Sequence, residues 1–106
     1  MTPARNINNT LTGEIIRLVC DIWGVSRADL TSRSRRRPLP WARAQLCEYL
    51  RRYAGHDTLS CAALIHKSQQ AVSDYSHLYT QNRRTYSQFA ANDENLKKQV
   101  KHLCNS

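Results

Sequence analysis

The chain has 106 residues, of which 41% are hydrophobic. A chain of this length forms one domain, with enough buried surface for a core that needs no metal or disulfide. This composition excludes a disordered tail, and no run approaches the roughly 18 apolar residues of a membrane span. The net charge of +8 favours a polyanionic partner, with nucleic acid ahead of an anionic membrane.

The positive charge is concentrated in the first half of the chain. Ten of the sixteen basic residues lie within residues 1–54, and all ten are arginine. Guanidinium groups bind phosphate through paired hydrogen bonds and lose water more easily than ammonium groups do. This distribution therefore favours a polyanionic partner, and a soluble protein that merely happens to be basic is the alternative.

The cysteines form no C-x-x-C pair, and most fall among apolar positions. They are Cys20, Cys47, Cys61 and Cys104. We predict free thiols rather than disulfides or a metal site. Because no secretory signal begins the sequence, the reducing cytosol is the expected compartment. We expect no cofactor, no bound metal, no membrane contact and no small-molecule substrate.

Residues 1–11 are polar and aperiodic, which predicts a flexible N-terminal arm. A single helical domain is expected over residues 12–106. Its first helix runs from about Thr12, with apolar residues at helical spacing, and ends at Gly24. A short second helix follows, because Ser26 is placed to cap it and Asp29 lies three residues later.

An exposed basic loop is predicted for residues 31–40. Two prolines and a run of arginines exclude a core helix there, and the arginines are Arg33, Arg35, Arg36 and Arg37. A third helix is expected from about Pro40 to Tyr53. Its apolar stripe consists of Ala42, Leu46, Leu50 and Tyr53, and the arginines that lie off this stripe are Arg43, Arg51 and Arg52.

The segment at about residues 58–80 predicts a helix-turn-helix. Thr58 is expected to cap its first helix, with Leu59, Ala62 or Ala63, and Ile65 facing inward, and small Ala63 where the two helices cross. His66 and Lys67 form the turn, and Ser68 caps the second helix. The buried side of that helix is Ala71, Val72, Tyr75 and Tyr79.

The start of the second helix is left exposed and polar. In a helix-turn-helix this end enters the major groove, and glutamine pairs with adenine there. The predicted major-groove residues are Lys67, Ser68, Gln69, Gln70 and Ser73. An ordinary helical hairpin with a polar turn is the alternative that requires no ligand.

Residues 81–104 are expected to hold one or two further helices. Tyr86, Phe89, Leu96, Val100 and Leu103 recur at helical spacing, and Asn92 is a candidate cap. Packing against the core is one interpretation of this pattern. The alternative is a homodimer in which Leu96, Val100 and Leu103 pair with a second copy.

The order of these features resembles the C-terminal DNA-binding domain (domain IV) of the bacterial replication initiator DnaA. Four stretches carry the resemblance: residues 23–30, which end in Ala-Asp-Leu; the basic loop at 32–37; residues 43–50; and Leu59-Ser60 with the helix-turn-helix after it. The tail also resembles the family's closing helix. The resemblance covers about residues 14–103. It implies an all-α, Trp-repressor-like bundle of about five to six helices, and a role in replication control or transcriptional regulation.

The resemblance also implies roles for individual residues. One arginine of the loop, among Arg33, Arg35, Arg36 and Arg37, would enter the minor groove, whose negative potential attracts it. Phosphate contacts are expected from Arg27, Arg43, His66 and His77. Gln69 and Gln70 stand where the family has two threonines, so the expected target differs from the standard DnaA box. The family's ATPase module is absent, as no G-x-x-x-x-G-K-[ST] motif occurs. We therefore expect a freestanding domain, encoded by a phage or mobile element, or a piece of a longer protein.

Other functions remain open. Non-specific nucleic-acid or RNA binding through the Ser/Arg loop is one alternative, and a protein-interaction module on the same scaffold is another. Catalysis is not expected, because Ser73, Asp74 and His77 on neighbouring helical turns make no triad without an oxyanion hole.

Overall fold

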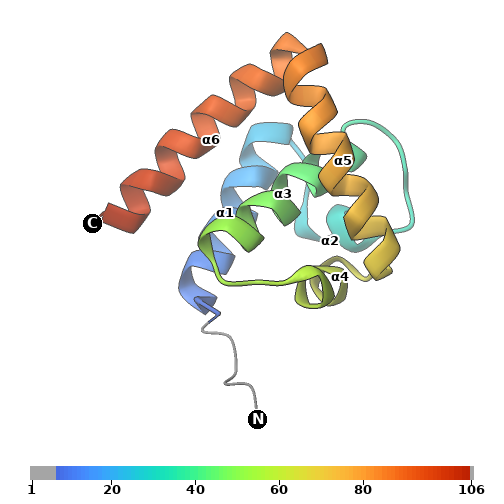
Figure 1. Cartoon of the computed structure of the whole chain (residues 1–106), viewed down its shortest axis with the longest axis horizontal. Coiled ribbons are helices and arrows are strands. Elements are labelled where there is room, and N and C mark those ends of the chain that lie inside the picture. Colours follow the sequence, from blue (N-terminus) through green and yellow to red (C-terminus); the bar gives the residue numbers. More distant parts are fainter. Residues whose placement is uncertain (1–6, 106) are drawn as a thin grey trace.

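The computed structural model describes residues 7–105, and this part of the chain consists of helices without strands (Figure 1). The helices are α1 (Asn9–Trp23), α2 (Arg27–Thr31), α3 (Leu39–Tyr53), α4 (Thr58–Ile65), α5 (Gln69–Thr85) and α6 (Ser87–Asn105). The predicted all-α bundle is confirmed. None of these helices is long and apolar enough to cross a lipid bilayer.

Helix α1 begins three residues earlier than the sequence pattern suggested. The Asn8 side chain accepts a hydrogen bond from the Leu11 amide at 2.9 Å and so caps the helix. Leu11 is buried. Residues 8–11 therefore belong to the folded domain and not to an arm, because the Asn8 amide also donates to the Ala54 carbonyl at 3.0 Å. Residues 1–6 of the expected arm lie outside the described residues.

Helix α3 occupies the centre of the bundle and contacts each of the other five helices (Figure 1). Its predicted stripe is confirmed at Ala42, Leu46 and Leu50, which are fully buried, and Tyr53 is half-buried. The prediction that Arg43 lies off this stripe is wrong, since its side chain is also fully buried. Arg43 lies on the same side of α3 as Leu46 and Leu50, three and seven positions further on.

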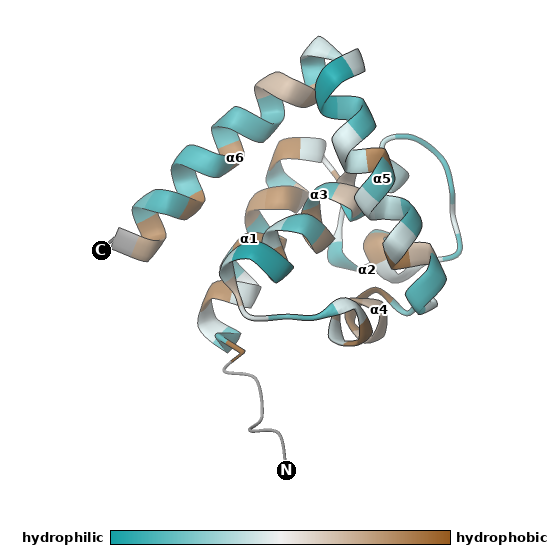
Figure 2. Cartoon of the chain, viewed as in Figure 1, coloured by the Kyte–Doolittle hydropathy of each residue, from teal (hydrophilic) through white to brown (hydrophobic). Residues whose placement is uncertain are grey.

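The outer helices carry most of the polar surface. Figure 2 shows a largely hydrophobic ribbon at α4, whereas most of α5, α6 and the loop between α2 and α3 is hydrophilic. This is the distribution expected of helices that pack one face on a core and present the other to water.

A buried polar network joins four helices. The Asp93 carboxylate of α6 is fully buried, accepts a hydrogen bond from the Tyr79 hydroxyl at 2.8 Å and pairs with Arg83 at 3.2 Å. The Gln45 amide donates to the same carboxylate at 3.3 Å and accepts from the Trp23 indole at 2.8 Å. Burial and the bond to Asp93 raise the pKa of Tyr79 to about 12, so this hydroxyl remains a donor at neutral pH.

Helix α6 is continuous, and the expectation that Asn92 caps a separate helix is wrong. Asn92 lies in the interior of α6, next to Asp93. The helix continues through this point because Phe89 and Leu96, on either side of Asp93, are fully buried in the core. Val100 is fully buried as well, so the packing interpretation holds for Leu96 and Val100, and neither is available to a second copy.

All four cysteines are free thiols, as the sequence predicted. Cys47 and Cys61 are buried at the contact between α3 and α4, where the Cys61 thiol donates to the Cys47 carbonyl at 3.8 Å. Cys20 is half-buried and Cys104 is exposed. Within residues 7–105 no cluster of three or more His, Cys, Asp or Glu side chains is placed to hold a metal ion.

His56 links α1 to α4 from a buried position. Its Nε2 and Nδ1 lie 2.9 Å from the hydroxyls of Thr12 and Ser60, respectively. Each of these hydroxyls also donates to a backbone carbonyl, Thr12 to that of Asn8 at 2.8 Å and Ser60 to that of Asp57 at 3.2 Å. Burial lowers the pKa of His56, against a smaller opposing effect of Asp57.

We expect His56 to make stability depend on pH. Neutral His56 makes its full contribution to the free energy of unfolding above the ordinary histidine pKa of 6.5. It declines below that value, because the unfolded chain binds a proton that the folded chain resists. Urea unfolding should show this decline between about pH 7 and about pH 5. His56→Gln should be less stable at neutral pH and lose most of the decline. An identical pH profile in the variant would contradict this account.

Candidate nucleic-acid interface

The basic loop between α2 and α3 is built around one buried guanidinium group. Arg43 donates from Nε to the Leu30 carbonyl at 2.9 Å and from Nη1 to the Ser34 carbonyl at 2.7 Å. Its Nη2 donates to the carbonyls of Asp29 at 3.0 Å and Ser32 at 2.9 Å. Four backbone carbonyls of α2 and the loop are thus satisfied by one side chain.

This placement overturns the expectation that Arg43 holds a phosphate. The side chain has 0% exposure, and a guanidinium group has only five N–H donors. Four hydrogen bonds to the protein's own backbone therefore occupy nearly all of its capacity. The sequence contained a signal for burial, because Arg43 precedes Leu46 by three residues and Leu50 by seven and so shares their face of α3.

A turn of three residues, His66 to Ser68, joins α4 to α5. His66 ends α4 in a left-handed conformation, with φ 56° and ψ 45°. Ser68 caps α5, and its side chain accepts from the Ala71 amide at 3.1 Å, as predicted. The cap of α4 is Asp57 rather than Thr58: its carboxylate accepts from the Ser60 amide at 2.8 Å.

Two further predictions within α4 are wrong. Leu59 was expected to face inward but is 61% exposed. Ala63 was expected at the helix crossing but is exposed, and its neighbour Ala62 is the buried small residue. The buried face of α4 consists of Cys61, Ala62 and Ile65, because the cap at Asp57 sets the direction in which the first turn points.

Lys67 joins the turn to the basic loop. Its ammonium donates to the Ser32 carbonyl, the same oxygen that accepts from Arg43. Burial lowers the pKa of Lys67, and the nearby positive charges of Arg43, Arg35 and Arg33 lower it further. Lys67 is only partly exposed, so it does not stand out from the surface as a base-reading side chain would.

The remaining residues predicted for the major groove lie on the surface. Ser68, Gln69, Gln70 and Ser73 are all exposed at the N-terminal end of α5. The Gln70 amide donates to the Asp74 carboxylate, one turn further along α5, at 3.1 Å. This bond holds the Gln70 side chain along the helix surface.

The loop and α5 form one surface around a hollow of about 480 Å³. The residues that line it are Arg33, Arg35, Pro40, Arg43, Lys67, Ala71, Asp74 and Tyr75. Four of these side chains are basic and one is acidic. Two features that the sequence analysis identified separately, the arginine run and the start of α5, are thereby brought together. Asp74 and Tyr75 complete this wall, although neither was predicted to belong to the site.

Arg37 does not belong to this surface. Its guanidinium group lies over the Trp41 ring, at 4.8 Å from the centroid, and near Tyr86, at 6.0 Å. Tyr86 follows the C-terminal end of α5, a helix of 17 residues that spans about 25 Å. Arg37 is thus anchored at the opposite end of α5 from Gln69.

The other three side chains that were expected to contact phosphate are exposed, but they lie on different parts of the fold. Arg27 lies at the start of α2, His66 lies in the turn, and His77 lies in the middle of α5. Arg36 is exposed in the loop, where its carbonyl accepts from the Leu39 amide at 2.9 Å. Of Arg27, His66 and His77, only His66 is next in sequence to a residue that lines the hollow, Lys67.

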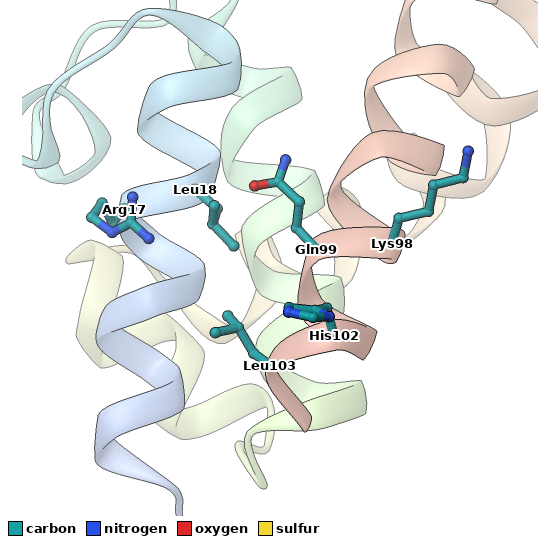
Figure 3. A pocket seen from close by; sticks show the side chains of 6 residues that line it. All are labelled: Arg17, Leu18, Lys98, Gln99, His102 and Leu103. Atoms are coloured by element: carbon teal, nitrogen blue, oxygen red, sulfur yellow. The ribbon is translucent and has the colours of Figure 1, made fainter. Parts of the chain in front are cut away.

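A further hollow, of about 280 Å³, lies between α1 and α6 (Figure 3). Leu18 and Leu103 point into this space, whereas Lys98 extends away from it. Arg17 is paired with Glu14 at 2.7 Å and Asp21 at 3.4 Å. The charged side chains around this hollow do not point toward one common position, in contrast to the basic side chains of the hollow beside α5.

Comparisons with protein-family models, with curated protein sequences and with solved structures found no match to this chain. The coarse fold, an all-helical bundle, therefore comes from the structure, and any function must be argued from the site itself.

We expect Arg43→Met to lower the free energy of unfolding by about 3 kcal/mol or more, because it removes charge-assisted hydrogen bonds to several carbonyls. The matched control is Arg84→Met, the same change at an exposed position on α5; it should stay within about 0.5 kcal/mol of the parent protein. Urea unfolding measures both variants. Equal stability of the two would show that the buried guanidinium does not hold the loop.

Proposed function

We propose that this chain binds double-stranded DNA, with the N-terminal end of α5 in the major groove and the loop at residues 32–36 against the adjacent minor groove. One observation carries the proposal: Arg33, Arg35 and the first turns of α5 line a single cationic hollow. Phosphate oxygens are attracted to such a surface, and counterion release strengthens binding.

The residues at the start of α5 favour sequence-specific binding. Gln69 and Gln70 are exposed there, and a glutamine amide can donate to adenine N7 and accept from adenine N6. The carboxylate of Asp74 can accept from cytosine N4, whereas it would repel a phosphate. These groups suit base edges better than a backbone.

The proposed scaffold is Trp-repressor-like, as the resemblance to DnaA domain IV implies. The bundle has a short helix, a basic loop, a long central helix and a helix-turn-helix in the corresponding order. A role in replication control or transcriptional regulation is part of the proposal. Because the base-reading residues differ from the family's, we propose a target other than the standard DnaA box.

Selection of bound sequences from a random duplex pool tests the proposal, and we expect one motif to be enriched. Preference for RNA, or binding without selection, would replace the proposal with non-specific nucleic-acid binding. The absence of any nucleic-acid binding would leave a protein-interaction module as the better interpretation.

Two substitutions should distinguish base-specific contacts from electrostatic contacts with the phosphates. Gln70→Ala should weaken binding to the selected motif by roughly 5- to 150-fold, because it removes a pair worth about 1–3 kcal/mol of discrimination. It should leave the salt dependence unchanged. Arg35→Ala should weaken binding to all duplexes and lower the salt slope by about one. Titrations at several salt concentrations measure both effects.

The control for this pair is Lys101→Ala, an exposed lysine on α6. Helix α6 extends away from the loop and from the start of α5 (Figure 1). Affinity and salt slope should therefore match those of the parent protein. If Gln70→Ala and Arg35→Ala both behaved like this control, the proposed DNA-binding surface would be wrong.

A further inference from the structure

The Ser32 carbonyl accepts hydrogen bonds from two positively charged donors. One is the Arg43 guanidinium of α3, at 2.9 Å, and the other is the Lys67 ammonium from the helix-turn-helix. A carbonyl oxygen has two lone pairs, so both bonds form at once. The basic loop is thus attached at one atom both to the core and to the turn before α5.

Lys67 extends from a rigid part of the backbone. Its own amide donates to the Ala62 carbonyl at 2.9 Å. The residues on either side are also fixed, as His66 ends α4 and Ser68 caps α5. On this fixed backbone the Lys67 ammonium can hold the loop in one position, whereas the same lysine in a mobile turn could not.

Electrostatic repulsion from the neighbouring arginines disfavours the position of the Lys67 ammonium beside the Ser32 carbonyl. Arg43, Arg35 and Arg33 are close enough to lower the pKa of Lys67, and exposed lysines normally extend into water. The hydrogen bond to Ser32 therefore compensates for bringing a fourth cation into this group. The cost of ordering a long lysine side chain also offsets part of the gain from that bond.

We propose that Lys67 is a positioning residue that fixes the arginine loop relative to α5, in place of the major-groove contact expected from the sequence. This inference rests on the proposed DNA binding of the same surface. With the loop held, Arg33 and Arg35 keep a set distance from Gln69 and Gln70. The loop and the start of α5 then bind the duplex without a further entropic cost of ordering the loop.

The first test uses the free protein. Lys67→Met keeps most of the aliphatic chain but cannot donate, and Lys67→Arg keeps a cationic donor. We expect Lys67→Met to speed amide hydrogen exchange in residues 32–36 several-fold while the amides of α3 and α5 exchange as before. Lys67→Arg should exchange like the parent protein. Unchanged exchange of the loop amides in Lys67→Met would overturn the proposal.

The second test uses the duplex motif selected by the parent protein. Lys67→Met should weaken binding by roughly 3- to 10-fold, the cost of ordering the loop on association. The salt slope should not change, because no phosphate contact is lost. Base preference should weaken only at the positions read by the loop, and Lys67→Arg should restore it.

A double-mutant cycle with Arg35→Ala gives the sharpest readout. If Lys67 acts through the loop, Lys67→Met should cost less in the Arg35→Ala background than in the parent protein. A salt slope lowered by about one, or altered preference at the positions read by α5, would show direct contact and overturn the proposal. Lys67→Met should be compared throughout with Lys101→Met, a lysine exposed on α6.

The two proposals can fail separately. If the parent protein bound no duplex, the proposed function would fail, and hydrogen exchange of the loop would still decide whether Lys67 holds it. If the parent protein bound a motif and the Lys67 variants had the properties of a direct contact, only the positioning role would fail.

Discussion

A fully buried guanidinium group organises the surface of this protein. The donors of Arg43 are satisfied by backbone carbonyls of residues 29–34, and no carboxylate of residues 7–105 is among its hydrogen-bond partners. A charge that is removed from water must be fully hydrogen-bonded, or it destabilises the fold. The loop must therefore adopt the one path that presents those carbonyls to α3. Everything on the outer side of the loop, including Arg33 and Arg35, is positioned by this internal requirement.

The basic residues consequently divide into two groups with different tasks. Arg43 and Lys67 point inward and hold the backbone, and they converge on the carbonyl of Ser32. Arg33 and Arg35 are the exposed arginines of the hollow beside α5, which Arg43 and Lys67 also line. Arg43 and Lys67 bring positive charge close to the two exposed arginines, which is electrostatically unfavourable. Their hydrogen bonds to backbone carbonyls offset this repulsion. A surface assembled in this way would be ready for a polyanion before the polyanion arrives.

Helix α5 is held at both ends by different means. At its start, Ser68 caps the helix, and the adjacent Lys67 donates to the Ser32 carbonyl of the loop. Towards its end, Tyr79 and Arg83 bind the buried carboxylate of Asp93 on α6. Since Tyr79 keeps its proton at neutral pH, this second attachment does not weaken over the physiological range. The exposed face of α5 is thus presented by a helix that cannot rotate freely on the core.

Local features of the structure could be read from the sequence. Helical periodicity predicted the bundle and the buried stripe of α3, and short-range caps predicted the starts of α2 at Ser26 and α5 at Ser68. These features depend on residues three or four positions apart, so the pattern itself contains the information. The same reasoning failed where a neighbour changed the local outcome, as at Leu59, whose helix is capped one residue earlier than expected.

The sequence by itself determined that this is a basic, all-helical chain with an arginine-rich loop and a polar helix start. Only the tertiary structure decided which cations face inward and which face outward. Arg43 reaches Leu30 across 13 positions in the chain, and Lys67 reaches Ser32 across 35. The partner of a buried polar group is set by how the helices pack and not by its neighbours in sequence. The arginines of the loop were therefore evident in the sequence, whereas the backbone contacts of Arg43 and Lys67 became visible only in the folded molecule.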